Sequence, residues 1–177
     1  MLPELLINRR LFFALDLPAP QRKAVARWRA ELHLRAGKPV PSGNFHITLM
    51  FLGEVPLAQL EAIYDAVEAM PKPEGQVLLL LDQLDHWRAA EALVLAARQP
   101  PKALLRLVYN LEQALLPLGL GDTRREYRPH LTLARKYSGQ IPEAGMAPEF
   151  MLRAGAFGLY ESVRGQYRLL RSWALAG

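Results

Sequence analysis

Two short segments of the chain each carry a histidine followed two positions later by a threonine. Residues 45–51 read FHITLMF and residues 129–135 read PHLTLAR, so both contain His-x-Thr-Leu within an apolar, strand-like run. The chain has only four histidines, and two of them, His46 and His130, share this setting. Because histidine titrates near pH ~6.5, two imidazoles that face each other can exchange protons with a substrate at neutral pH. The repeated motif therefore indicates acid–base chemistry.

Alternation along a strand determines which of these side chains can act together. Successive side chains point to opposite faces, which places His46 with Thr48 on one face and His130 with Thr132 on one face. The Cα atoms of each pair are then about 6.6 Å apart, at a rise of about 3.3 Å per residue. The imidazole and the hydroxyl of one motif can therefore contact the same small anion.

Two such strands lying side by side would form a site suited to phosphoryl transfer. In-line displacement places the attacking and leaving groups on opposite sides of phosphorus. One neutral imidazole can take a proton from the attacking group while a protonated one gives a proton to the leaving oxygen. The hydroxyls of Thr48 and Thr132 can donate to the non-bridging oxygens. This chemistry requires no metal and no cofactor, and the chain has no Gly-x-x-x-x-Gly-Lys-Ser/Thr phosphate loop. The residues alone leave open which histidine is the acid.

Two less specific interpretations compete with this one. A single His-x-Thr in a strand is commonly structural, with a hydrogen-bonded threonine beside the histidine. A histidine-rich metal site is the second alternative, but neither motif contains a carboxylate and the chain has no His-x-x-x-His. The remaining histidines, His33 on a charged helix and His86 beside Asp85 and Trp87, are expected to be structural.

The length and composition of the chain limit the classes of protein to which it can belong. With 177 residues, 51% of them hydrophobic and 22% charged, the chain is expected to form one compact globular domain over residues 1–177, of one or two lobes. The absence of cysteine excludes disulfides, a thiol nucleophile and cysteine-ligated metals. The N-terminal apolar run stops at Asp16, and no run approaches the ~20 residues that span a bilayer. We therefore expect a cytoplasmic protein that does not act at a membrane.

The positive charge is concentrated in the last third of the chain. The net charge is +5, and nine basic against five acidic residues lie from Gly121 onward. Arginine predominates among them, and its forked guanidinium suits phosphate. A second hypothesis follows, in which this basic third makes the chain an RNA-binding module without catalysis.

The pattern of apolar residues predicts a mixed α+β fold. Helices are expected around three apolar faces: Val25, Trp28 and Leu32; Leu60, Ile63, Tyr64 and Val67; and Leu104, Val108, Leu111 and Leu115. Strands are expected at residues 11–15, 45–52, 76–84, 92–97, 150–159 and 167–175 and at the second motif, with 76–84 paired to 92–97. Residues 53–56, Gly-Glu-Val-Pro, are expected to turn the chain, and residues 122–128 to form a basic loop.

At four places the sequence resembles the 2H phosphoesterases, which are named for two His-x-Thr motifs, and among them the RNA 2′,3′-cyclic phosphodiesterases first described as 2′-5′ RNA ligases. The resembling segments are residues 10–18, residues 44–55, residues 128–135 and residues 159–162 before Trp173. The resemblance implies a bilobal α+β fold with two pseudo-symmetric sheets, flanking helices and a central cleft. It also implies a monomeric enzyme without cofactors that hydrolyses RNA or oligonucleotide 2′,3′-cyclic phosphates to 2′-phosphates, with ATP-independent 2′-5′ joining as the reverse reaction.

The resemblance also implies a role for each site residue. His46 would be the proton donor to the departing 3′-oxygen, His130 the base that activates water, and Arg135 a phosphate-binding residue. Strict alternation would turn Arg135 away from His130, so its role requires a bulge, a strand end or a side chain that curls around the strand.

Overall fold

The two motifs lie on strands of a fold that combines helices with runs of consecutive strands. The structure is a computed structural model, and it describes residues 7–121 and 126–175. Its strands are β1 (Asn8–Leu15), β2 (Lys38–Pro39), β3 (Ile47–Pro56), β4 (Val77–Leu81), β5 (Gln83–Trp87), β6 (Ala92–Ala96), β7 (His130–Arg135), β8 (Phe150–Ala154), β9 (Ala156–Val163) and β10 (Gln166–Ala174). Its helices are α1 (Ala19–Ala30), α2 (Leu60–Ala69) and α3 (Lys102–Leu115). Residues 122–125 of the expected basic loop lie outside the described residues.

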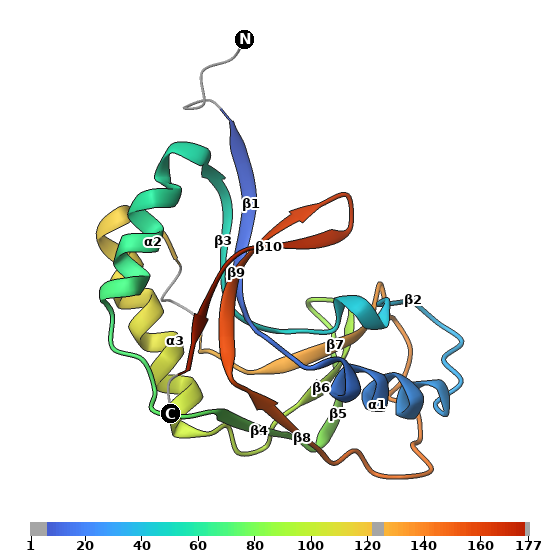
Figure 1. Cartoon of the computed structure of the whole chain (residues 1–177). Coiled ribbons are helices and arrows are strands. Elements are labelled where there is room, and N and C mark those ends of the chain that lie inside the picture. The colour runs from blue at the N-terminus through green and yellow to red at the C-terminus, as the bar shows by residue number, and fades with distance from the viewer. Residues whose placement is uncertain (1–6, 122–125, 176–177) are drawn as a thin grey trace.

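Each motif strand belongs to a different sheet. One sheet has the order β10-β9-β1-β3, the other has the order β2-β7-β6-β5, and β4 with β8 forms a two-stranded ladder. The paired strands run antiparallel throughout these sheets. Figure 1 shows α2 and α3 side by side against the first sheet, and α1 beside the second. The α+β prediction is confirmed.

The predicted apolar face of α3 packs into the core. Its four predicted positions are all buried: Leu104, Val108, Leu111 and Leu115. The helix begins after Pro101, whose fixed φ suits a helix start, and the short turn that follows it ends at Gly119 with φ +73°. α2 buries Ile63 and Val67 in the same way. Both helices therefore cover the sheet that carries the first motif.

The first helix is shorter than its apolar pattern predicts. It ends at Ala30, and Leu32 is buried just beyond it. The guanidinium of Arg29 donates to the backbone carbonyls of Val40 and Leu133. This contact ties α1 to the strand that carries the second motif.

The predicted turn at residues 53–56 is wrong, because β3 continues through it to Pro56. Residues 8–11 of β1 supply partners for residues 53–56, so the strand ladder extends past the glycine. Gly53 adopts φ +72° beside a register shift between Leu11 and Phe12. Its left-handed conformation bends the strand without ending it.

Two predicted strands are each divided. Residues 76–84 form β4 and β5, and residues 150–159 form β8 and β9. β5 pairs with β6 as expected, but β4 pairs with β8, about seventy positions away. The expectation of one strand pair is therefore corrected in part, because a local apolar pattern does not specify a distant partner. Among the described residues no helix combines the length and apolarity needed to cross a membrane.

Candidate active site

All four motif residues line one cavity between the two sheets. His46 lies directly before β3 and Thr48 within it, while His130 begins β7 and Thr132 follows on the same strand. The cavity has a volume of about 370 Å³ and is also lined by Phe51, Trp87, Ala90, Glu91, Ala92, Arg135 and Lys136. The structure thus brings together every residue that the sequence proposed for the site.

The two imidazoles are held by the same backbone contact. Nδ1 of His46 lies 2.8 Å from the carbonyl oxygen of Asn44, and Nδ1 of His130 lies 2.9 Å from that of Arg128. A carbonyl only accepts hydrogen bonds, so Nδ1 carries a proton in both rings. In the neutral ring Nε2 is then the unprotonated nitrogen. Each histidine can therefore take or give a proton through Nε2.

The resemblance between the motifs extends to a β-bulge directly after each threonine. In β3, Met50 opposes Phe13 while Thr48 opposes Ala14, which leaves Leu49 as an extra residue. In β7, Ala134 opposes Leu93 while Thr132 opposes Val94, which leaves Leu133 as the extra residue. An extra residue reverses the alternation of the side chains beyond it.

The bulges decide which later side chains reach the site. Phe51 and Arg135, each five positions after its motif histidine, both line the cavity that holds His46 and His130. Strict alternation would have placed both on the opposite face. Two of the three conditions stated for Arg135 are therefore met, because a bulge precedes it and β7 ends at it.

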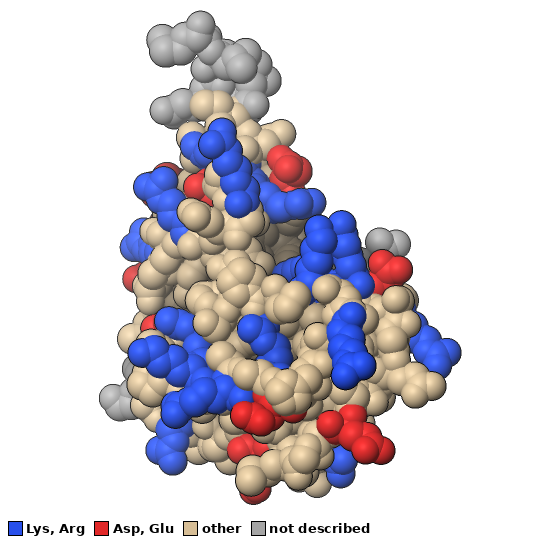
Figure 2. Space-filling view, turned by 90° about the vertical axis from the view of Figure 1, so that its right-hand side faces the viewer, with Lys and Arg blue, Asp and Glu red and all other residues tan. Residues whose placement is uncertain are grey.

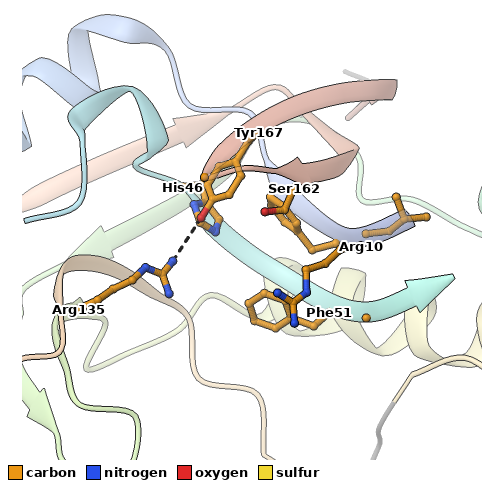
Figure 3. A pocket seen from close by; sticks show the side chains of 10 residues that line it. Arg10, His46, Phe51, Arg135, Ser162 and Tyr167 are labelled. Atoms are coloured by element: carbon orange, nitrogen blue, oxygen red, sulfur yellow. Dashed lines mark hydrogen bonds between the residues drawn. The ribbon is translucent and has the colours of Figure 1, made fainter. Parts of the chain in front are cut away.

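Arg135 and Arg10 bring positive charge to the entrance beside His46. A cavity of about 530 Å³ adjoins the central one and is lined by both arginines together with His46, Phe51 and Tyr167. The guanidinium of Arg135 donates to the Tyr167 hydroxyl at 3.3 Å, as Figure 3 shows. In Figure 2 lysine and arginine side chains gather around a hollow on this face. The entrance is therefore suited to an anionic ligand.

Burial and positive charge act together on the histidines. Burial lowers the pKa of His46, the charges of Arg135 and His130 lower it further, and its contact with the Asn44 carbonyl opposes them. Burial likewise lowers the pKa of His130, with the charges of Arg128 and Arg135 adding to it and the Arg128 carbonyl opposing. A proton on His130 disfavours a second proton on His46. The two histidines therefore favour states in which at most one of them is positively charged.

Aromatic rings pack against each imidazole. The ring of His46 lies 5.2 Å from that of Phe12 and 5.0 Å from that of Tyr167, measured between centroids. The ring of His130 lies 4.2 Å from that of Trp87. Sequence reasoning missed Phe12, Phe51 and Trp87, because an aromatic residue in a strand gives no sign of the face it shares with a distant motif.

A half-buried tyrosine joins the two halves of the site. Tyr127 lies shortly before the second motif, and its hydroxyl donates to the carbonyl oxygen of Thr48 in the first at 2.8 Å. Burial strongly raises its pKa, so the hydroxyl stays protonated as a donor. A third cavity, of about 500 Å³, extends from here along His130, Trp87 and Arg128. The central cavity is thus continued on both sides.

The other two histidines lie outside the central cavity. Nε2 of His86 lies 2.9 Å from the Tyr137 carbonyl oxygen, and its ring packs edge-on against Tyr137. His33 is exposed at the turn after α1, with φ +50°. Within residues 7–121 and 126–175, no group of three or more histidine, aspartate or glutamate side chains could hold a metal ion.

Known proteins resemble this chain in sequence and in fold over nearly its whole length. The family described as LigT like Phosphoesterase matches residues 15–89. The RNA 2′,3′-cyclic phosphodiesterase of Escherichia coli (strain K12) is 35% identical over 175 residues, which cover 94% of this chain and 97% of that protein. The crystal structure of E. coli LigT complexed with 3′-AMP has a TM-score of 0.87 at 33% identity, covering 97% of this chain and 100% of that one. The structure of E. coli LigT complexed with phosphate has a TM-score of 0.82 at 34% identity, covering 96% and 99%. The chain therefore belongs to the LigT-like 2H phosphoesterase family.

Proposed function

We propose that this protein hydrolyses RNA 2′,3′-cyclic phosphate ends to 2′-phosphomonoesters without metal or nucleotide cofactor. The observation that carries the proposal is the pair of histidines, each held at Nδ1 by a backbone carbonyl, which line one cavity from two different sheets. The E. coli relative is named for activity on RNA 2′,3′-cyclic phosphates, which supports the same substrate class here.

In the proposed reaction, His130 and His46 act on opposite sides of phosphorus. Nε2 of neutral His130 takes a proton from water as the water oxygen bonds to phosphorus. The bond from phosphorus to the 3′-oxygen breaks, and Nε2 of protonated His46 gives its proton to that oxygen. The product carries a 2′-phosphate and a 3′-hydroxyl. The proton on His130 must return to His46, directly or through solvent, before the next turnover.

The threonines and Arg135 act on the phosphate rather than on protons. Thr48 and Thr132 line the same cavity and can donate to the non-bridging oxygens, where negative charge accumulates in the transition state. Arg135 adds a charge-assisted donor to these oxygens. Its positive charge also holds the pKa of both histidines down.

A second proposed reaction, ATP-independent 2′-5′ joining of RNA ends, uses the same groups on the same cyclic phosphate. A 5′-hydroxyl replaces water as the group that gives its proton to His130. The cavity of about 500 Å³ beside His130 supports this extension, because a water molecule alone needs far less room.

We further propose that the protein acts as a monomer in which residues 1–177 form one bilobal domain. Support comes from the cavity itself, since both sheets of one chain supply its histidines, so that the site needs no second copy. We also propose a cytoplasmic location, which suits an enzyme acting on RNA ends.

The test is to incubate the protein with an oligonucleotide ending in a 2′,3′-cyclic phosphate, without metal or ATP, and to identify the position of the product phosphate. A 2′-phosphate is expected, and a 3′-phosphate would contradict the assigned leaving group. His46→Ala and His130→Ala should each lower the rate by about 10²–10⁴-fold while the protein stays folded.

A matched control replaces a histidine outside the cavity. His33→Asn should keep full activity, since asparagine tolerates the positive φ of this exposed position. If the wild type turned over nothing and RNA binding survived loss of both motif histidines, the basic C-terminal third would instead make this an RNA-binding module.

A further inference from the structure

One aromatic side chain, that of Trp87, packs directly against the histidine proposed as the base. The rings of Trp87 and His130 lie 4.2 Å apart between centroids, with their planes inclined at 51°. Trp87 ends β5, a strand that is separated from β7 by β6. Something must therefore direct the indole toward His130.

Asp85 supplies that direction. On β6, Trp87 lies opposite Ala92, whereas His130 lies opposite Ala96. The two side chains therefore start four positions apart along the sheet. Nε1 of Trp87 donates to Oδ2 of Asp85 at 3.2 Å, so the indole is turned back along β5 toward the level of the motif. Oδ1 of the same carboxylate accepts the backbone N–H of His86 at 2.8 Å, which holds the carboxylate in place.

The same indole also contacts Arg128, which lies two positions before the motif histidine. The guanidinium carbon of Arg128 is 4.6 Å from the centroid of the Trp87 ring. The backbone carbonyl of Arg128 accepts from Nδ1 of His130 at 2.9 Å. Trp87 thus touches both the imidazole and the residue whose carbonyl orients it.

We propose that Asp85 and Trp87 are positioning residues for His130, a role that rests on the proposed function of His130 as the base. Asp85 aims the indole, and the indole packs against the imidazole and holds the Arg128 side chain beside it. Neither residue moves a proton. Their effect is to keep Nε2 of His130 in line with the phosphate, since small displacements of a catalytic group strongly lower the rate.

The charges around His130 give this role a measurable signature. The groups concerned are Arg128 and Arg135, His46 across the cavity, Asp85 at the indole N–H, and the lining residues Glu91, Glu112, Glu126 and Lys136. Loosening Trp87 lets water reach the imidazole and releases the guanidinium of Arg128. Both changes remove causes that hold the pKa of His130 down, so its pKa should rise.

Asp85→Ala removes the acceptor, and Trp87→Phe keeps an aromatic ring but removes the N–H donor. Each should lower kcat by about 10-fold or more with little change in KM. The two effects should not add in the double variant, because both remove the same hydrogen bond. Asp85→Asn has a single acceptor oxygen for the two N–H donors that the carboxylate serves, so its rate should lie between those of the wild type and Asp85→Ala.

Trp28→Phe is the matched control, because Nε1 of Trp28 also donates one hydrogen bond, to the Met146 carbonyl at 2.8 Å. It should leave kcat and KM unchanged. A rise in KM with normal kcat in Trp87→Phe would make Trp87 a substrate contact and overturn the proposal. Additive losses in the double variant would overturn it as well.

A titration of the histidine ring protons by NMR, without substrate, separates this proposal from the proposed function. The resonance of His130 is assigned as the one missing from His130→Ala. Its pKa should rise in Trp87→Phe, which keeps the Asp85 carboxylate, and stay unchanged in Trp28→Phe. An unchanged pKa in Trp87→Phe would refute the positioning role, whether or not the wild type hydrolyses cyclic phosphates.

Discussion

Replacing Arg135 by glutamine tests the reasoning that joins the bulge in β7 to the chemistry of the site. The substitution keeps a long polar side chain and removes the positive charge. Arg135 is exposed at the end of its strand, with one hydrogen bond, to the Tyr167 hydroxyl. Its loss should therefore change the free energy of unfolding by less than about 0.5 kcal/mol. The effect should instead fall on catalysis.

The magnitude follows from the interaction that is lost. A hydrogen bond from a charged group contributes about 1.5–3 kcal/mol. At about 1.4 kcal/mol for each factor of ten, kcat/KM should fall by roughly 10- to 150-fold. Most of this loss should appear at every pH, because the donor to the phosphate is absent throughout.

The pH profile carries the second part of the prediction. The charge of Arg135 lowers the pKa of both His46 and His130, so its removal should raise both values. The acid limb of kcat/KM reports the group that must be neutral, and the alkaline limb reports the group that must be protonated. Both limbs should therefore move to higher pH, and the maximum should move with them.

The assay is hydrolysis of a 2′,3′-cyclic nucleotide between about pH 5 and about pH 9, around the range in which histidine titrates. Arg27→Gln is the matched control, because Arg27 is an exposed arginine of α1. The reasoning would be refuted by an Arg135→Gln enzyme with wild-type kcat/KM and an unmoved profile. The bulge would then place Arg135 at the cavity without engaging the phosphate.

Three further outcomes are expected. The wild-type kcat/KM should follow a bell with its maximum below pH ~6.5, because the pKa of both histidines is lowered from that value. Excess chelator should leave the rate unchanged, since the proposed proton transfers use only side chains, and a chelator-dependent loss restored by a metal would contradict the mechanism. Tyr127→Phe should lower the free energy of unfolding by about 1 kcal/mol in denaturant titration, because the hydroxyl bond to the Thr48 carbonyl is lost, and it should lower kcat as well.

Local patterns in the sequence correctly predicted the helices and strands whose formation depends on neighbouring residues. The apolar face of α3 repeats every three or four residues, and all its predicted positions are buried. The motif strands were equally readable, because alternation is a property of a few neighbouring residues. The turn expected at residues 53–56 was wrong because β1 supplies a partner that keeps this segment in the sheet. The pairing of β4 with β8 likewise depends on a distant segment.

The sequence by itself determined the chemistry of this protein: two matched histidine and threonine pairs, an arginine after the second, and no thiol. Only the tertiary structure decided which other side chains share their cavity. Arg135 and Phe51 reach it through bulges, and a bulge is defined by the register with a partner strand. Trp87 reaches His130 across an intervening strand, guided by Asp85. Residue types are local properties of the chain, whereas register and packing arise from contacts between distant segments, and no short pattern encodes those.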